Sequence, residues 1–179
     1  MPPPLSQHVA QFYEDDEFLT ESLVSFVKAG LQNNEMVIIV ATASRVHTLR
    51  QALTPDDLSN TGLSFFDAAA LLSYFMVDDW PNHALFMAVL GQHIQEAGRK
   101  RRVRVYGEMV AVLWSNGQYQ AALCLEGLWN TLQTTQPFDL LHAYPHRSHS
   151  VTSEIDSAKW LAVYQAHSHV CHQHSDSSN

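Results

Sequence analysis

The stretch at residues 102–114 constrains the fold more than any other part of the chain. It reads Arg-Val-Arg-Val-Tyr-Gly-Glu-Met-Val-Ala-Val-Leu-Trp, a pattern that predicts a short strand turning into a helix at Gly107. Successive strand side chains point to opposite faces, so one face carries two valines and the glycine. The other face carries three polar residues: Arg104, Tyr106 and Glu108. A central strand of a parallel sheet is usually apolar on both faces, so this polar face requires a ligand or an ion-pair partner.

Strand patterns alternate with helical patterns along the rest of the chain. The predicted strands are a short edge strand at 8–13 and strands at 36–41, 63–67, 102–107 and 138–144. The predicted helix caps are Asp15 or Asp16, Ser44 and Asp67, and a last helix is predicted over 153–170. This alternation is typical of an α/β domain. We therefore expect a three-layer fold, in which helices flank a mostly parallel sheet.

The chain length and composition suit one globular domain. There are 179 residues, of which 46% are hydrophobic and 16% charged, and no repeat or interior linker divides them. This length is enough to bury a sizeable core. We expect a single domain over residues 1–179, with its core at about 8–170 and a disordered tail at 171–179.

Charge and targeting patterns limit the partners that the chain can have. The formal net charge of −8 gives no general attraction to nucleic acid or to an anionic membrane. The N-terminus lacks a secretory pattern, and the apolar run at 36–41 is too short to span a bilayer. Two cysteines, Cys124 and Cys171, are no disulfide framework. We expect a cytoplasmic protein with no nucleic-acid or membrane partner.

Nucleotide chemistry is excluded by the segment that follows the predicted strand at 36–41. A phosphate-binding loop there would read Gly-x4-Gly-Lys-Ser/Thr, because its glycines let backbone N–H groups wrap the phosphates. Residues 41–50 read Ala-Thr-Ala-Ser-Arg-Val-His-Thr-Leu-Arg and contain neither glycine nor lysine. No Gly-x-Gly-x-x-Gly is present either. The sequence thus predicts neither ATP hydrolysis nor dinucleotide chemistry, and no cofactor.

Two carboxylates lie where they could serve a site. Glu108 stands at a strand end and a predicted helix N-terminus, where the anion is favoured, so it faces either a ligand or an arginine. Glu126 shares a helix face with Trp129 and Asn130, at spacings of three and four residues. This face suits a small polar ligand, and it equally suits an ion pair with Arg102 or Arg104. Both interpretations of each carboxylate stay open.

Eleven histidines suggest a metal, and they are densest near the C-terminus. The weak candidate ligands are His167, His169, Cys171 and His172. A structural zinc site needs four ligands that the fold fixes, and this cluster runs into a polar end. We therefore predict no specific metal site. No catalytic nucleophile is predicted either, because Cys124 lies in the middle of a helical pattern, where a buried thiol is inert.

Several motifs together resemble the MEDS domain, the methanogen/methylotroph DcmR-type sensory domain. The most specific are Arg-Val-Tyr-Gly-Glu-Met from Arg104 and Leu-Glu-Gly-Leu-Trp-Asn from Leu125. The resemblance also rests on His8, Phe12-Tyr13, and residues 30–42, 66–68, 113–114 and 143–145. It implies a ligand-responsive sensory module with a core like the RecA/KaiC ATPases but without their phosphate loop. The chain departs from the family at Asn34, where a Gly-Glu turn is usual, and at His142, where a cysteine often stands.

The resulting prediction is a stand-alone sensory module without catalysis. A small molecule would bind at the carboxyl edge of the sheet, and the signal would pass to a partner protein or to a second copy of the chain. The predicted ligand contacts are His8, Tyr13, Arg104, Tyr106, Glu108, Glu126 and Trp129. One alternative is an enzyme that uses Glu108 and Glu126 as acid and base. Another is a degenerate scaffold in which these groups only stabilise the core.

Overall fold

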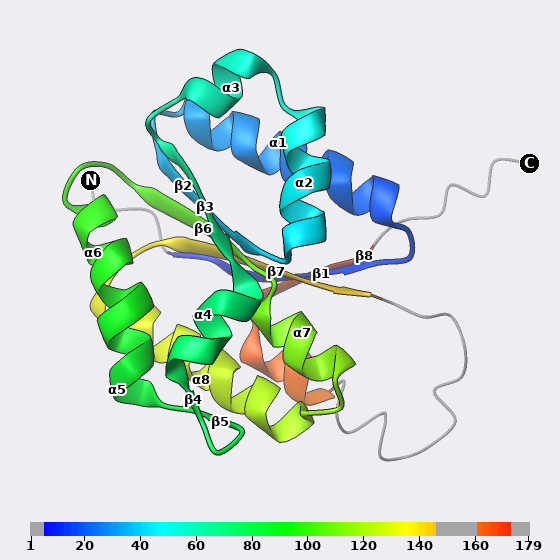
Figure 1. Ribbon diagram of the computed structural model, residues 1–179, viewed down its shortest axis with the longest axis vertical. Helices are drawn as coiled ribbons and strands as arrows, with labels where there is room; N and C mark the ends of the chain where they lie inside the picture. Colours follow the sequence, from blue (N-terminus) through cyan, green and yellow to red (C-terminus); the bar gives the residue numbers. More distant parts are fainter. Residues whose placement is uncertain (1–5, 146–160, 173–179) are drawn as a thin grey trace, which may run out of the picture.

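The computed structural model describes residues 6–145 and 161–172 as an α/β fold built on a six-stranded parallel sheet (Figure 1). The strand order is β3-β2-β6-β7-β1-β8, and every neighbouring pair is parallel. The strands are β1 His8–Tyr13, β2 Met36–Ala41, β3 Leu63–Asp67, β6 Val103–Gly107, β7 Asp139–Pro145 and β8 His169–His172. The predicted fold class is therefore confirmed. Among the described residues, no helix has both the length and the apolarity that crossing a bilayer requires.

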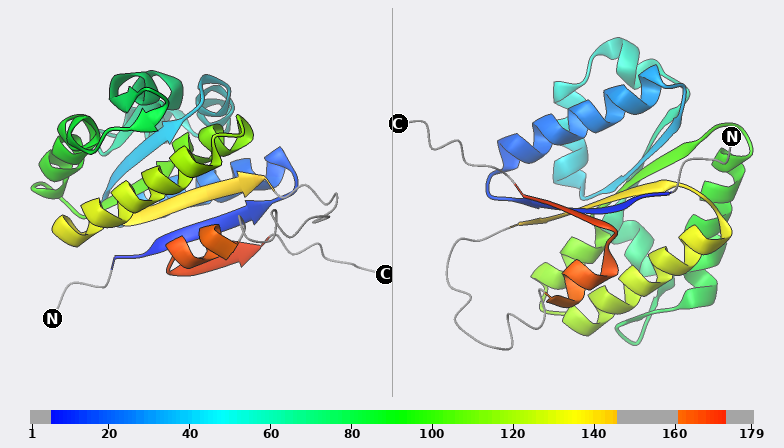
Figure 2. Two further views of the ribbon diagram at one scale, coloured as in Figure 1. Left: turned by 90° about the horizontal axis from the view of Figure 1, so that it is seen from below. Right: turned by 180° about the vertical axis from the view of Figure 1, so that it is seen from behind.

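Helices cover both faces of the sheet (Figures 1 and 2). One face carries α1 Asp16–Gln32, α2 Ala43–Ala52 and α3 Pro55–Ser59. The other carries α4 Ala68–Phe75, α5 His83–Phe86, the π-helical turn η1 Met87–Gly91, α6 Gln92–Gly98, α7 Met109–Ser115 and α8 Tyr119–Thr135. A short helix at residues 161–166 lies beside α8 on this second face (Figure 2). We call the two sides the α1 face and the α8 face.

Strand alternation divides the core into two apolar clusters, as residues 102–114 predict. Val103 and Val105 pack on the α8 face, whereas Tyr106 packs on the α1 face with Leu23 of α1. The central strand β2 contributes to both clusters, because five of its six residues are buried. Burial on both faces explains its continuous apolar sequence.

Local hydrogen bonds explain where the helices begin. Asp15 accepts from the backbone N–H of Phe18 at 2.8 Å, and Asp67 accepts from that of Ala70 at 2.8 Å, so both predicted caps are confirmed. The prediction of Ser44 as a cap is wrong. The hydroxyl of Thr42 accepts from the N–H of Arg45 instead, and α2 therefore starts one residue before Ser44.

The C-terminal part differs most from prediction. The expected helix over 153–170 is wrong at its end, because the described helix stops at residue 166 and β8 begins at His169. β8 pairs with β1, which leaves β1 inside the sheet rather than at its edge. In the middle of the chain, a hairpin of β4 Met76–Val77 and β5 Trp80–Pro81 was also not predicted. Most of the predicted tail lies outside the described residues.

Gly30 offers a sharp test of packing on the α1 face. A Cβ atom there would lie 2.5 Å from Cγ2 of Val37 and 2.8 Å from Cδ of Arg104. We expect Gly30→Ala to lower the free energy of unfolding by about 1–3 kcal/mol, because both neighbours must move. Gly127→Ala is the matched control: nothing lies within 4 Å of its Cβ position, and alanine stabilises a helix by up to about 1 kcal/mol. Urea unfolding measures both changes, and equal effects would contradict the packing argument.

Candidate functional site

The sheet separates the seven predicted ligand contacts into two groups. Tyr13, Arg104, Tyr106 and Glu108 interact with groups of the α1 face. His8, Glu126 and Trp129 lie on the α8 face, where the polar groups of His8 and Glu126 meet. The two groups form separate sites, so the predicted contacts do not line one pocket.

Glu108 faces an arginine, and that arginine is not Arg104. One carboxylate oxygen of Glu108 accepts from the backbone N–H of Thr42 at 2.7 Å, and the other accepts from Nε of Arg45 at 3.2 Å. Arg45 also donates to Asp16 at 2.8 Å and lies 5.9 Å from the ring centre of Tyr13. Glu108 is 7% exposed. These contacts tie the ends of β2 and β6 to α1 and α2.

Tyr106 is enclosed beside this ion pair. Burial, followed by the nearby charge of Glu108, raises the pKa of the Tyr106 phenol well above its ordinary value. The phenol therefore stays protonated at neutral pH. Its oxygen is buried without a hydrogen-bond partner among the described residues. Burial also raises the pKa of Tyr13, although Arg45 opposes the shift.

Arg104 is held by the protein itself. Its Nε donates to the carboxylate of Glu35, and its Nη1 donates to the carbonyl oxygen of Phe26 at 3.0 Å. Glu35 is 5% exposed, so this ion pair is largely removed from water. Arg102 in turn bonds Asp139 at 2.6 Å. The interpretation of Glu126 as a partner of Arg102 or Arg104 is therefore wrong.

The α8 face contains a cluster of buried ionisable side chains, which we call the polar centre. Its members are His8 of β1, Glu126 of α8, His142 of β7, Tyr144 of β7 and His167, which precedes β8. The exposed fractions of the four His and Glu residues range from 1% to 9%. Since His8 begins β1 and His142 is the fourth residue of β7, the polar centre lies beneath the sheet rather than beyond its carboxyl edge.

Glu126 is the hub of the polar centre. Nδ1 of His142 lies 2.9 Å from Oε1 of Glu126, and the hydroxyl of Tyr144 donates to the same oxygen. Nε2 of His167 lies 3.2 Å from Oε1, and Nε2 of His8 lies 3.2 Å from Oε2. Oε2 has no partner with hydrogen-bond geometry among the described residues. The carboxylate is thus surrounded by nitrogen atoms but incompletely hydrogen-bonded.

The outer nitrogens of two imidazoles have fixed roles. The amide N–H of Asn130 donates to the carbonyl oxygen of Ala166 at 3.1 Å, which turns its Oδ1 toward Nδ1 of His8 at 2.8 Å. Nδ1 of His167 lies 2.7 Å from the carbonyl oxygen of Val163. Both Nδ1 atoms must donate, because these oxygens can only accept. In the neutral rings, Nε2 of His8 and of His167 therefore carries a lone pair that faces Glu126.

The pKa values show how burial and charge compete in this cluster. Burial lowers the pKa of His142 to about 4, so this ring is neutral at neutral pH. Burial disfavours the charged form of Glu126 as well, but the surrounding histidines outweigh it and hold the pKa of the carboxyl well below its ordinary value. For His167, burial is again outweighed, here by the nearby Glu126, and the pKa is raised. The centre thus combines an anion with at least one neutral imidazole.

Trp129 packs against the polar centre and makes no polar contact with it. Its ring centre lies 5.2 Å from that of Phe86, 5.8 Å from that of His142 and 6.1 Å from that of Phe138. Trp129 is fully buried, and its Nε1 has no hydrogen-bond partner among the described residues. These contacts belong to the apolar core.

Three members of the polar centre were not predicted as ligand contacts: His142, Tyr144 and His167. His142 was treated as a departure from a family, and His167 only as part of a weak metal cluster. The other weak candidates, His169 and Cys171, are exposed on β8, and His172 ends that strand. The usable signal was strand alternation, because His142 and Tyr144 point to the same face of a buried strand.

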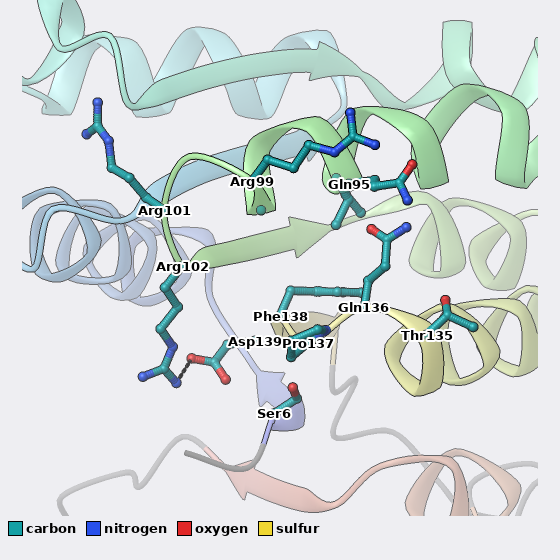
Figure 3. A pocket seen from close by; sticks show the side chains of 12 residues that line it. Ser6, Gln95, Arg99, Arg101, Arg102, Thr135, Gln136, Pro137, Phe138 and Asp139 are labelled. Atoms are coloured by element: carbon teal, nitrogen blue, oxygen red, sulfur yellow. Dashed lines mark hydrogen bonds and ion pairs between the residues drawn. The ribbon is translucent and has the colours of Figure 1, made fainter. Parts of the chain in front are cut away.

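A separate pocket opens near the amino ends of β6 and β7, as Figure 3 shows. Its volume is about 540 Å³, and its polar lining includes Gln95, Arg99, Arg102 and Gln136. The ion pair of Arg102 with Asp139 closes one side (Figure 3). None of the seven predicted ligand contacts lines this pocket.

Comparison with known families agrees with the fold and with the motifs. Residues 7–168 match the family model described as MEDS: MEthanogen/methylotroph, DcmR Sensory domain. This match covers most of the chain, including every member of the polar centre. The fold is that of an α/β sensory domain, and the chain belongs to the MEDS family. A search of curated proteins found no match.

The contacts of Glu108 lead to a prediction for the α1 face. We expect Glu108→Gln to lower the free energy of unfolding by about 1–3 kcal/mol, because the partly buried side chain of Arg45 loses the charge of this partner. The exposed Glu96 provides the control, and Glu96→Gln should change stability by less than about 0.5 kcal/mol. Urea unfolding followed by circular dichroism measures both. A Glu108→Gln value equal to the control would show that this ion pair adds no stability.

Proposed function

We propose that this MEDS domain senses a small molecule at the polar centre and passes the change to a partner protein or to a second copy of itself. His8 and Glu126 are the two predicted ligand contacts that meet there. The observation that carries the proposal is the burial of three imidazoles, a phenol and a carboxylate in one cluster. Such a cluster costs more free energy than an apolar core of the same volume, and perturbed ionisable groups concentrate at functional sites.

The segment at residues 161–172 is a suitable element to carry the signal. It contacts the polar centre through His167, and its Ala166 carbonyl oxygen accepts from Asn130. The hydroxyl of Ser168 accepts from the N–H of His8 at 2.9 Å and donates to the carbonyl oxygen of His8 at 2.8 Å. A ligand that changes the contacts of His8 or Glu126 would therefore shift this segment, as differential binding shifts any two-state element.

Sensing is better supported than acid–base catalysis. An enzyme that used Glu108 and Glu126 would need both carboxyls in one open pocket. Glu108 is engaged by Thr42 and Arg45, and Glu126 by histidines and Tyr144, with no shared partner among these contacts. Membership of a sensory family points in the same direction.

Native mass spectrometry of the untagged full chain tests the proposal. We expect the chain, purified without added ligand, to carry a small organic molecule that denaturation releases. Glu126→Gln should abolish its retention, whereas the exposed control Glu96→Gln should retain it. The proposal fails if a folded Glu126→Gln variant retains the same molecule as the wild type, or if none of the chains carries one or shows a Glu126-dependent melting shift with extracted metabolites.

A further inference from the structure

The polar centre has the composition and the shape of a metal site. Four side chains each direct one potential ligand atom into the same space: His8, Glu126, His142 and His167. These atoms all lie within 4.8 Å of one another. They come from β1, α8, β7 and the turn before β8, so the fold rather than a flexible loop brings them together.

The separations between the ligand atoms suit a small ion. Four of them are 2.9 Å (His142 to Glu126), 3.2 Å (His8 to Glu126), 3.2 Å (His167 to Glu126) and 3.3 Å (His8 to His142). Tetrahedral ligands at about 2.1 Å from zinc lie about 3.4 Å apart. Side-chain movement would bring the remaining pairs of ligand atoms, which lie within 4.8 Å of one another, to this spacing.

When its imidazole rings are neutral, the hydrogen bonds of the cluster leave it short of positive charge. In neutral rings, Nε2 of His8 and Nε2 of His167 would each carry a lone pair that faces the carboxylate, because both Nδ1 atoms donate. Oε2 of Glu126 and Nε2 of His167 are buried without a hydrogen-bond partner among the described residues. Lone pairs that face an anion in a buried site repel it, and either a proton on the ring or a metal ion between the groups removes this repulsion.

The outer contacts are those that orient metal ligands. Metal-binding histidines usually donate their second ring N–H to a carbonyl oxygen or a carboxylate, which fixes the ring and its tautomer. Here Asn130 supplies that oxygen to His8, and the Val163 carbonyl supplies it to His167. Both ligand rings are therefore already oriented with Nε2 inward.

We infer that the polar centre binds one divalent transition-metal ion of the zinc class through His8 Nε2, His142 Nδ1, His167 Nε2 and the Glu126 carboxylate. Three imidazole nitrogens and one carboxylate favour such an ion over calcium or magnesium, which prefer all-oxygen sites. The inference uses the same centre as the proposed function and names the cation at it. The ion would also bind residues 161–172 to the core, because His167 belongs to that segment.

Metal content tests the inference directly. We expect the untagged full chain to retain one equivalent of Zn²⁺ after gel filtration, measured by inductively coupled plasma mass spectrometry. After removal of zinc with a chelator, Co²⁺ should bind with the visible absorption of a four- or five-coordinate site. Added Zn²⁺ should raise the melting temperature, because it binds the folded chain alone. Absence of Zn²⁺ binding in both the purified and the titrated chain overturns the inference.

Paired variants separate the polar centre from the histidines near the C-terminus. Glu126→Gln and His167→Gln should each weaken Zn²⁺ binding more than about 100-fold, beyond the usual loss for an outer contact. A chain with His169→Gln, Cys171→Ser, His172→Gln and His174→Gln should retain wild-type affinity. Circular dichroism checks folding, and His167→Gln serves if Glu126→Gln does not fold. Loss of zinc from the C-terminal variant alone, with retention in His167→Gln, would overturn the inference.

The two proposals fail in distinguishable ways. A chain that retains an organic molecule in a Glu126-dependent manner but binds no Zn²⁺ refutes the metal site and leaves the sensory proposal intact. A chain that binds Zn²⁺ through Glu126 but shows no Glu126-dependent organic ligand refutes small-molecule sensing and leaves the metal site intact. Native mass spectra of wild type and Glu126→Gln, combined with metal analysis, distinguish these cases.

Discussion

Replacement of Glu126 by alanine is expected to lower the free energy of unfolding by about 3–5 kcal/mol. The side chain is 1% exposed and is the common neighbour of three imidazoles and the Tyr144 hydroxyl. Its removal leaves buried donors without an acceptor and opens a polar cavity, and both effects disfavour the folded state. Urea unfolding in the presence of a chelator isolates this loss from any contribution of a bound metal.

A double-mutant cycle with Tyr144 identifies the source of this loss. Tyr144→Phe removes the hydroxyl that donates to Glu126 and keeps the ring. This ring stacks on Phe12, with 5.6 Å between the two ring centres. If the hydroxyl and the carboxylate act together, the coupling free energy with Glu126→Gln should be about 0.5–3 kcal/mol. Additive effects would show that the two groups contribute independently. A loss below about 1 kcal/mol for Glu126→Ala would contradict the central role of the carboxylate.

Much of the sheet could be predicted from sequence because its strands are buried on both faces. Residues 36–41 form an uninterrupted apolar run, and β2 occupies these same residues. Asp67 was placed correctly because a short acidic side chain before an alanine-rich helix has a local role that sequence displays. The division of β6 into two faces followed from a period of two and needed no knowledge of the partners.

β8 could not be predicted because its sequence does not specify a strand. It has four residues, His-Val-Cys-His, and its pairing depends on β1, which lies about 160 residues earlier in the chain. The predicted helix over 153–170 included the first two residues of this segment, and its last two were assigned to the predicted tail. A strand this short is stabilised by the neighbour whose hydrogen bonds it completes, and local propensity adds little.

The candidate site was predicted only in part, because the alternation of strand side chains assigns a residue to a face of the sheet but does not identify its ion-pair partner. Alternation assigned Glu108 and Arg104 to one face, but their partners are Arg45, 63 residues from Glu108, and Glu35, 69 residues from Arg104. His8 and Glu126 were predicted as ligand contacts and do meet. The clue that joins them to His142 is that all three occupy positions facing the apolar core, where an ionisable side chain needs partners.

Replacement of Trp129 by alanine is expected to cost about 3–5 kcal/mol of unfolding free energy, although the indole N–H has no hydrogen-bond partner among the described residues. The ring fills the space between Phe86, Phe138 and His142, and no water reaches it. Trp129→Phe is the matched variant. It should cost less, about 1–2 kcal/mol, because the indole N–H loses no partner within the part of the chain that the structure describes and most of the ring volume remains. Thermal and urea unfolding followed by circular dichroism measure both.

The phenylalanine variant also decides whether Trp129 contacts the ligand. If Trp129 only packs the core behind His142, Trp129→Phe should retain the small molecule and the Zn²⁺ affinity of the wild type. A folded Trp129→Phe variant that loses the molecule but keeps Zn²⁺ would place the indole in the ligand site, as the sequence predicted. Loss of both would indicate instead that the ring positions His142, whose imidazole lies 5.8 Å from it, because one displaced ligand weakens the whole coordination sphere.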